Sequence, residues 1–200
     1  MIGIIDYNTG NTHSLFNAYR LLNKKIKLIK TQSDFKDVSQ LILPGVGSFD
    51  IAMNHLKHTG LIEMLSEKVL EEKVPILGIC LGMQLMCLGS EEGKSPGLGW
   101  INRYVCKFPT NEPIPHMGWN SICVERSNSL LLDVPNESLF YFLHSYYVNY
   151  MDNDPLCSTT SEHSCIFTSS INIDNIYAVQ FHPEKSHKIG LKMLDNFATL

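Results

Sequence analysis

The stretch Val74-Pro75-Ile76-Leu77-Gly78-Ile79-Cys80-Leu81-Gly82-Met83-Gln84 decides the fold class of this 200-residue chain. Residues 74–79 are almost wholly apolar, which is typical of a strand buried in the middle of a parallel sheet. Residues 83–86 favour a helix. Between them, the pattern Gly78-x-Cys80-x-Gly82 matches the sharp strand-to-helix turn that presents a nucleophile at the edge of an α/β sheet.

Cys80 is therefore the candidate nucleophile. Glycines two residues before and after it remove the Cβ atoms that would clash in so tight a turn. The start of the following helix favours the thiolate, and the backbone N–H of Leu81 would point at a developing oxyanion. This segment alone also permits a buried, unreactive cysteine in a glycine-rich turn.

Short apolar runs alternate with helical patterns before this stretch. Strands are predicted at Ile2–Ile5, 27–30 and 41–43, and helices around 15–22 and 61–69. The second half carries strand-like segments at 101–107, 120–124, 139–149, 165–170 and 176–181, then a helix from about Ser186, whose hydroxyl is expected to cap it. The pattern predicts an α/β fold in a single domain, residues 1–200, with a largely parallel twisted sheet flanked by helices and some antiparallel strands in the second half.

Composition excludes several classes of protein. The chain is 44% hydrophobic and 18% charged with a net charge of −4, which argues against disorder and against nucleic acid or an anionic membrane as the main partner. No run approaches the roughly 20 apolar residues of a membrane-spanning helix. The six cysteines form no CxxC pair, and the first residues do not resemble a signal peptide, so we expect a cytoplasmic protein with reduced thiols. We expect the five cysteines other than Cys80 to be small buried side chains, and we expect no metal site.

A base for the nucleophile is predicted at His182-Pro183-Glu184, which follows the strand-like segment 176–181. Residues i and i+2 of an extended segment face the same side, and Pro183 biases His182 towards extended backbone. Glu184 is then able to orient the His182 imidazole while His182 faces the thiol. A solvated surface pair is the alternative for this motif taken singly.

The turn Pro44-Gly45-Val46-Gly47 closes another predicted strand. Its glycines allow the backbone to come close to a ligand. We interpret this turn as the second donor of an oxyanion hole, and a plain turn is the alternative.

These motifs together resemble the class I, or triad, glutamine amidotransferases, from residue 2 to the end of the chain. Three further segments, Asp6-Tyr7 with Gly10-Asn11, Pro115-His116-Met117-Gly118-Trp119-Asn120 and His144-Ser145-Tyr146-Tyr147, look like the glutaminase subunits of imidazole glycerol phosphate synthases within that family. The resemblance implies hydrolysis of L-glutamine to glutamate and ammonia through a thioester on Cys80, without a cofactor.

The resemblance also implies roles for individual residues. Gln84 and Glu92 would hold the amino-acid end of glutamine, and Gly47 and Leu81 would supply the oxyanion N–H groups. His182 would act as general base and acid, oriented by Glu184. A carboxylate such as Glu92 suits an ammonium, and Gln84 lies one helical turn beyond Cys80, on its face.

The implied partner is a separate (β/α)8-barrel cyclase subunit that receives the ammonia in histidine biosynthesis. Asn11, Trp119 and Lys185 match family positions at or near that interface. Asn8-Thr9-Gly10 and Leu88-Gly89 depart from the family pattern, so a second copy that serves another acceptor, such as a surface-sugar pathway, stays open. A different cysteine hydrolase, a redox protein and a non-catalytic binding module are further alternatives, which the joint presence of Gln84, Glu92 and the His182-Pro183-Glu184 motif disfavours.

One motif is a decoy. Gly89-Ser90-Glu91-Glu92-Gly93-Lys94-Ser95 resembles a phosphate-binding loop, but it has three residues between its glycines instead of four. Its two adjacent glutamates would also repel a phosphate. We therefore predict that no phosphate binds there.

Overall fold

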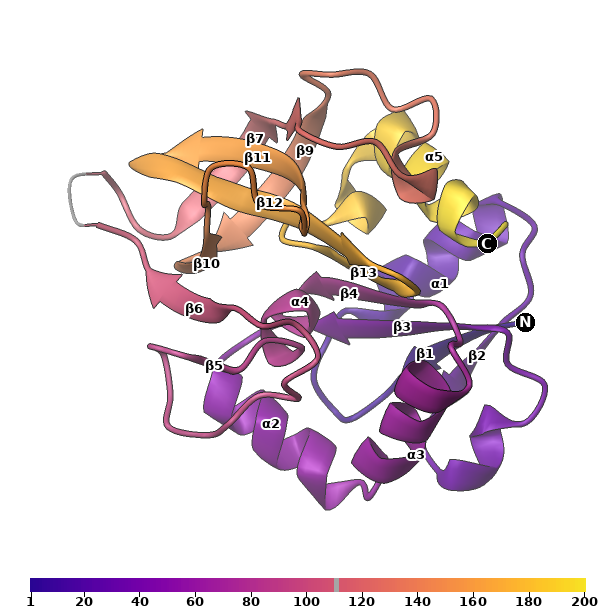
Figure 1. The fold of residues 1–200 in the computed structure, drawn as a ribbon. Coiled ribbons are helices and arrows are strands. Elements are labelled where there is room, and N and C mark those ends of the chain that lie inside the picture. Colours follow the sequence, from indigo (N-terminus) through magenta and orange to yellow (C-terminus); the bar gives the residue numbers. More distant parts are fainter. Residues whose placement is uncertain (110–111) are drawn as a thin grey trace.

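Five parallel strands form the centre of the fold in the computed structural model, which describes residues 1–109 and 112–200 (Figure 1). They lie in the order β2-β1-β3-β4-β13 and pair in parallel throughout. Their bounds are β1 (Ile2–Ile5), β2 (Ile26–Ile29), β3 (Gln40–Gly45), β4 (Ile76–Cys80) and β13 (Ile176–Val179). The apolar runs of the sequence thus become the buried parallel strands that they predicted.

The rest of the main sheet is mostly antiparallel, as predicted for the second half. From β13 it continues through β12, β10 and β6 to β5, with β11 and β8 joined to β12 on a side branch, and β7 pairs with β9 in a second sheet. The bounds are β5 (Gly89–Ser90), β6 (Tyr104–Lys107), β7 (His116–Ser121), β8 (Cys123–Val124), β9 (Leu139–His144), β10 (Tyr146–Asn149), β11 (Cys157–His163) and β12 (Cys165–Ile173).

Helices cover both faces of the parallel strands (Figure 1). On one face lie α2 (Phe49–His58), α3 (Ile62–Ser66) and a π-helical turn, η2 (Glu67–Glu71). On the other lie α1 (Thr12–Leu21) and α5 (His187–Phe197). Alternation along β3 serves both faces, because Leu41 and Leu43 pack with α2 and α3 while Ile42 packs with α1 and α5. The short elements are η1 (Gln32–Phe35), α4 (Leu81–Leu85), η3 (Ser129–Leu131) and η4 (Pro183–Lys185).

Several local expectations need correction. The helix expected over 61–69 divides into α3 and η2, and neither α2 nor β11 was expected. Ser186 does occupy the N-cap position of α5, but its hydroxyl does not cap the helix. It donates to the His182 carbonyl at 2.6 Å and accepts from the Tyr141 N–H at 3.0 Å, so it ties η4 to β9.

The expectation that five cysteines are buried is wrong for three of them. Cys87 and Cys157 are buried, whereas Cys106 and Cys165 are half-buried and Cys123 is exposed. Cys123 follows the fully buried Ile122, and strand alternation then turns its side chain outward. In the described part of the chain, no helix has the length and apolar character needed to cross a membrane.

Strand register places the functional motifs at one edge of the sheet. Gly45 pairs with Cys80 where β3 and β4 end together, and Ile79 pairs with Val179 of β13. Because parallel strands end at a common edge, the glycine turn after β3, the cysteine after β4 and the histidine after β13 converge there. Ligands of open α/β sheets bind in the crevice outside such carboxyl ends.

Candidate active site

Cys80 forms a strained turn between β4 and α4. Its φ of 54° and ψ of −111° lie outside the geometry that residues with side chains favour. A Cβ atom on Gly78 would lie 2.8 Å from the Met86 sulfur, and one on Gly82 would overlap the Leu43 carbonyl oxygen. The two glycines therefore allow α4 to fold back against β3 and β4, as predicted. With only five residues, α4 limits the helix dipole on which the thiolate was expected to depend.

The thiol is buried, and two polar groups contact it. Cys80 Sγ donates to the Leu143 carbonyl at 3.7 Å, and Nε2 of Gln180 donates to Sγ at 3.7 Å. Gln180 was not predicted from the sequence as part of the site. A signal was present, because Gln180 precedes His182 by two residues and so shares its face in an extended segment.

His182 and Glu184 form the predicted pair, with 2.8 Å between Nδ1 and Oε1 and side chains that are 2% and 3% exposed. The backbone differs from the expectation, because β13 already ends at Val179 and Glu184 lies in the 3-10 turn η4. Burial alone would lower the pKa of His182. The thiolate form of Cys80 and the Glu184 carboxylate, each through its charge and a hydrogen bond, outweigh burial and raise the pKa of His182 to about 10.

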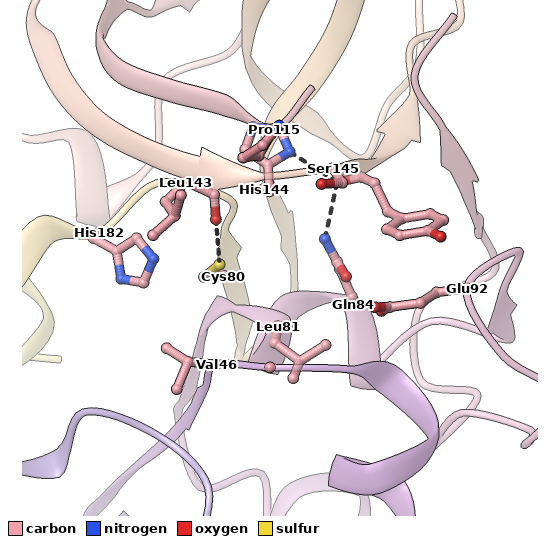
Figure 2. A pocket seen from close by; sticks show the side chains of 12 residues that line it. Val46, Cys80, Leu81, Gln84, Glu92, Pro115, Leu143, His144, Ser145 and His182 are labelled. Atoms are coloured by element: carbon pink, nitrogen blue, oxygen red, sulfur yellow. Dashed lines mark hydrogen bonds between the residues drawn. The ribbon is translucent and has the colours of Figure 1, made fainter. Parts of the chain in front are cut away.

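A cavity of about 230 Å³ opens beside this pair. Figure 2 shows His182 and Cys80 at one end of it and Gln84 and Glu92 at the other. The volume is below the roughly 300–1,000 Å³ typical of pockets for drug-sized ligands, so it suits a molecule of amino-acid size. In the part of the chain that the structure describes, no group of three His, Cys, Asp or Glu side chains is arranged to hold a metal ion.

The end of the cavity away from His182 is polar. Nε2 of Gln84 donates to the Tyr146 carbonyl at 3.0 Å and to Gln180 Oε1 at 2.9 Å, so the Gln84 amide is held in one orientation. Oε2 of Glu92 accepts the Phe49 N–H at 3.0 Å. Burial and the nearby Asp50 charge raise the pKa of Glu92, and the Phe49 N–H opposes this shift.

The two residues expected to supply oxyanion donors, Gly47 and Leu81, both line the cavity. Gly47 has a φ of 100°, which favours glycine. The turn runs close against α4, because a Cβ atom on Gly45 would lie 2.8 Å from the Leu81 Cβ. The buried Tyr7 hydroxyl donates to the Pro44 carbonyl at 2.6 Å and so fixes the start of the turn.

A line of hydrogen bonds supports the wall formed by β7 and β9. His144 Nδ1 lies 2.8 Å from the Tyr146 carbonyl, so it carries the proton and leaves Nε2 to accept from His116 Nδ1 at 3.0 Å. His116 Nε2 in turn accepts from the Asn120 amide at 3.2 Å. Burial, together with the repulsion of neighbouring imidazoles, lowers the pKa of His116 to about 4 and that of His144 to about 3. Both rings are therefore neutral near pH 7, and their hydrogen bonds hold β7 against β9.

The predicted interface residues lie in different settings. Trp119 is 46% exposed, stacks on His187 at 4.9 Å and meets the edge of Tyr141. Lys185 Nζ lies 5.7 Å from the centre of the Tyr141 ring, so Tyr141 joins these two residues. Asn11 caps α1, where its side chain accepts the Ser14 N–H and donates to the Ser14 hydroxyl.

Comparisons with known proteins agree with this geometry. The family model described as glutamine amidotransferase class-I matches residues 3–199. The chain is 43% identical to the imidazole glycerol phosphate synthase subunit HisH of Leptospira interrogans, over 100% of both chains, and 47% identical to HisH 2 of Methanococcus maripaludis, over 98% of both. A solved glutamine amidotransferase structure superimposes with a TM-score of 0.77 at 15% identity, covering 100% of this chain and 99% of that one.

Proposed function

The chain belongs to the class I glutamine amidotransferases, and from this premise we propose that it works as the glutaminase subunit of an imidazole glycerol phosphate synthase. Residues 1–200 would form one glutaminase domain. The observation that carries the proposal is the convergence of Cys80, the His182–Glu184 pair, Gln84 and Glu92 on one cavity of amino-acid size. The six cysteines are all free, which supports the predicted cytoplasmic location, where thiols stay reduced.

The reaction starts at the Cys80 sulfur. The thiolate adds to the side-chain amide carbon of L-glutamine, and the C=O electron pair moves onto oxygen. The backbone N–H groups of Gly47 and Leu81 stabilise that oxyanion. His182 carries a proton because its pKa is raised, and it delivers this proton to the amide nitrogen as the C–N bond breaks. Ammonia leaves, and a γ-glutamyl thioester remains on Cys80.

Hydrolysis of the thioester completes the cycle. His182 is now neutral and takes a proton from water as the water oxygen attacks the thioester carbon. Sulfur leaves as the thiolate and glutamate is released. Glu184 keeps the imidazole oriented through both halves of the reaction, since its Oε1 stays bonded to Nδ1 while Nε2 exchanges the proton.

The far end of the cavity selects an amino acid. Glu92 would bind the α-ammonium of glutamine, and the fixed Gln84 amide would contribute its carbonyl oxygen nearby. Glu92 and Cys80 lie at opposite ends of the cavity (Figure 2), so a glutamine held by its α-ammonium at Glu92 would extend its side-chain amide towards Cys80.

A barrel-type cyclase subunit would dock on the outer face of the β7–β9 sheet. Alternation along these strands turns four apolar side chains outward, with Met117 opposite Leu143 in the register and Trp119 and Leu139 along the same face. Exposed apolar patches of this kind mark protein interfaces. Leu143 belongs to this face through its side chain and to the active site through its carbonyl, which accepts from Cys80. A partner on this face would therefore sit directly behind the nucleophile.

The partner would also control the rate. We propose that the Gly45–Gly47 turn rests with its peptide turned away from the oxyanion until the loaded partner binds, which avoids wasted glutamine. Val46, in the middle of the turn, is 41% exposed and within reach of a partner. Strong glutaminase activity of the isolated chain would contradict this resting state.

The test is glutamate release from L-glutamine by the purified chain, alone and with a barrel cyclase subunit from the same source and its ribonucleotide substrate. Stimulation by the loaded partner, lost in Cys80→Ala, is the expected result. Activity that ignores this partner would point to another acceptor. No glutamate release, together with no reaction of Cys80 with an alkylating glutamine analogue, would contradict the glutaminase function.

A further inference from the structure

The segment Gly89–Ser95, which resembles a phosphate loop in sequence, binds a carboxylate of its own chain. The Lys94 N–H lies 3.0 Å from both carboxylate oxygens of Asp50, and the Ser95 N–H donates to Asp50 Oδ1 at 2.8 Å. These backbone donors hold the pKa of Asp50 below its ordinary value. The N–H groups that a phosphate would need are thus already occupied.

A second bond runs in the opposite direction. The Phe49 N–H, adjacent to Asp50 at the start of α2, donates to Glu92 Oε2 at 3.0 Å. Helix and loop therefore hold each other at two neighbouring points, and we call this arrangement the 49–95 clamp; its members are Phe49, Asp50, Glu92, Lys94 and Ser95. Gly93 makes it possible, because a Cβ atom there would overlap the Asp50 carboxylate.

On one side, the clamp adjoins the end of the turn Pro44–Gly47, which we call the oxyanion turn. Phe49 follows Gly47 by two residues, so the position of its N–H fixes where the turn must finish. The turn starts at Pro44, whose carbonyl is held by the Tyr7 hydroxyl at 2.6 Å. Gly47 therefore lies on a short segment that is anchored at both ends.

The other side of the clamp is the substrate cavity, which Glu92 lines. Glu92 is also fixed through its backbone, because its N–H donates to the hydroxyl of the buried Ser90 at 3.1 Å. The Asp50 charge opposes the ionised form of Glu92 and contributes to its raised pKa. An ammonium in the cavity would offset the repulsion between the Asp50 and Glu92 carboxylates. The clamp is therefore most stable when a cationic group is bound.

We propose that Asp50 is a positioning residue that, through the 49–95 clamp, fixes Glu92 as a ligand shared by the α-ammonium of glutamine and the end of the oxyanion turn. The inference rests on the proposed function, because glutamine is what would bring the ammonium. It adds that substrate recognition and the oxyanion turn are joined by one carboxylate. Asp50 itself lies outside the set of residues that line the cavity.

The test compares two reagents that alkylate Cys80. The first is glutamine with a diazoketone in place of its side-chain amide, and the second is its deamino form, which keeps the diazoketone and the carboxylate but has no ammonium. Both form a thioether with Cys80 and release N₂, and mass spectrometry of the Cys80 peptide gives the rates. Asp50→Asn should slow the first reagent about tenfold or more, the cost of weakening hydrogen bonds to a charged group. It should slow the second reagent by a clearly smaller factor, because that reagent still meets the oxyanion turn but has no ammonium for Glu92 to bind. Gly93→Ala, which disrupts the clamp from the loop side, should give the same pattern.

Asp34→Asn is the matched control. Asp34 accepts the backbone N–H groups of Lys30 and Thr31 in a similar way, beside β2 at the edge of the parallel sheet. It should leave both rates unchanged. Equal slowing of both reagents by Asp50→Asn, or no slowing of either, would overturn the positioning role. A wild-type chain that reacts no faster with the ammonium-bearing reagent than with its deamino form would contradict the ammonium site of the proposed function itself.

Discussion

Gln84 and Gln180 are joined side chain to side chain: Nε2 of Gln84 donates to Oε1 of Gln180 at 2.9 Å, and Nε2 of Gln180 reaches the Cys80 sulfur at 3.7 Å. Both glutamines are buried. The two bonds form one line from the end of the cavity where the amino acid would bind to the nucleophile. The orientation of each amide is set by the other, because half a turn of Gln180 would place a donor against a donor, and half a turn of Gln84 would place an acceptor against an acceptor.

Replacing Gln180 with methionine should break this line while keeping the volume of the side chain. One buried amide proton of Gln84 then loses its acceptor, which costs about 1–3 kcal/mol of unfolding free energy. The KM for glutamine should rise several-fold, because Gln84 is no longer fixed. Urea denaturation and steady-state kinetics measure the two effects. The control is Gln32→Met, since Gln32 is exposed and makes only a long 3.4 Å bond to the Gly60 carbonyl; equal effects of the two variants would refute the prediction.

Glu184→Gln should lower the rate of glutamate release by at least about a hundredfold, the range of a general acid–base contribution. The negative charge that helps to raise the pKa of His182 is lost. Its pKa falls, so the protonated imidazole is lost at a lower pH and the alkaline limb of the pH–rate profile moves to lower pH. The buried Oε2 of Glu184 has no hydrogen-bond partner among the described residues, and an amide NH₂ at that place would gain none. A profile with an unmoved alkaline limb would count against the orienting role.

The neutral pair of His116 and His144 should make the fold sensitive to acid. Their pKa values are lowered in the fold, to about 4 and about 3, so the unfolded chain binds protons from pH 6.5 downward that the folded chain does not. The unfolding free energy therefore falls as pH drops from about 6.5 towards 4. His116→Phe should make this fall shallower by about one proton, although it removes a hydrogen bond to His144. Denaturant titrations at several pH values measure how the unfolding free energy depends on pH. Equal pH dependence in the wild-type chain and in His116→Phe would disprove the lowered pKa of His116.

Trp119→Ala should weaken docking of the cyclase subunit by about 2 kcal/mol or more, as large aromatic residues near the centre of an interface do. The rate at which Cys80 reacts with the alkylating glutamine analogue should not change in the isolated chain, because Trp119 does not line the cavity. Calorimetric titration with the partner measures the affinity. Leu70→Ala is the control, since Leu70 is 42% exposed on η2, on the opposite side of the parallel sheet. Equal affinities of the two variants would place the interface elsewhere.

The parts of the fold, and the contacts between candidate site residues, that were predicted correctly depend on local signals. An apolar run followed by a glycine-containing turn is enough to locate β3 and β4, and the common edge of a parallel sheet then brings Cys80 and Gly47 to one cavity. His182 and Glu184 were paired correctly, although a 3-10 turn makes the contact in place of the extended segment that was expected. Several backbone conformations allow contact between side chains i and i+2, so the contact was easier to predict than the backbone conformation that makes it.

The missed elements depend on partners far away in the sequence. Strand β11 contains a run of serine and threonine that is buried without an apolar pattern. The hydroxyl of Thr159 is satisfied by Ser169 and Ser170 of β12, at 2.8 Å each. The clamp between Asp50 and the loop after Glu92 has the same character, because its two halves lie more than forty positions apart. No local sequence pattern predicts such contacts between distant residues.

The strained turn at Cys80 has a consequence for engineering this enzyme. With φ at 54°, position 80 has a backbone that glycine would occupy at lower energy, by about 1–3 kcal/mol. Thermostability and turnover therefore favour different residues at position 80. A selection for heat resistance alone would favour Cys80→Gly, which removes the nucleophilic thiol. Screens for more stable variants should keep Cys80 and change buried apolar side chains on the two faces of the sheet, where added stability does not compete with catalysis.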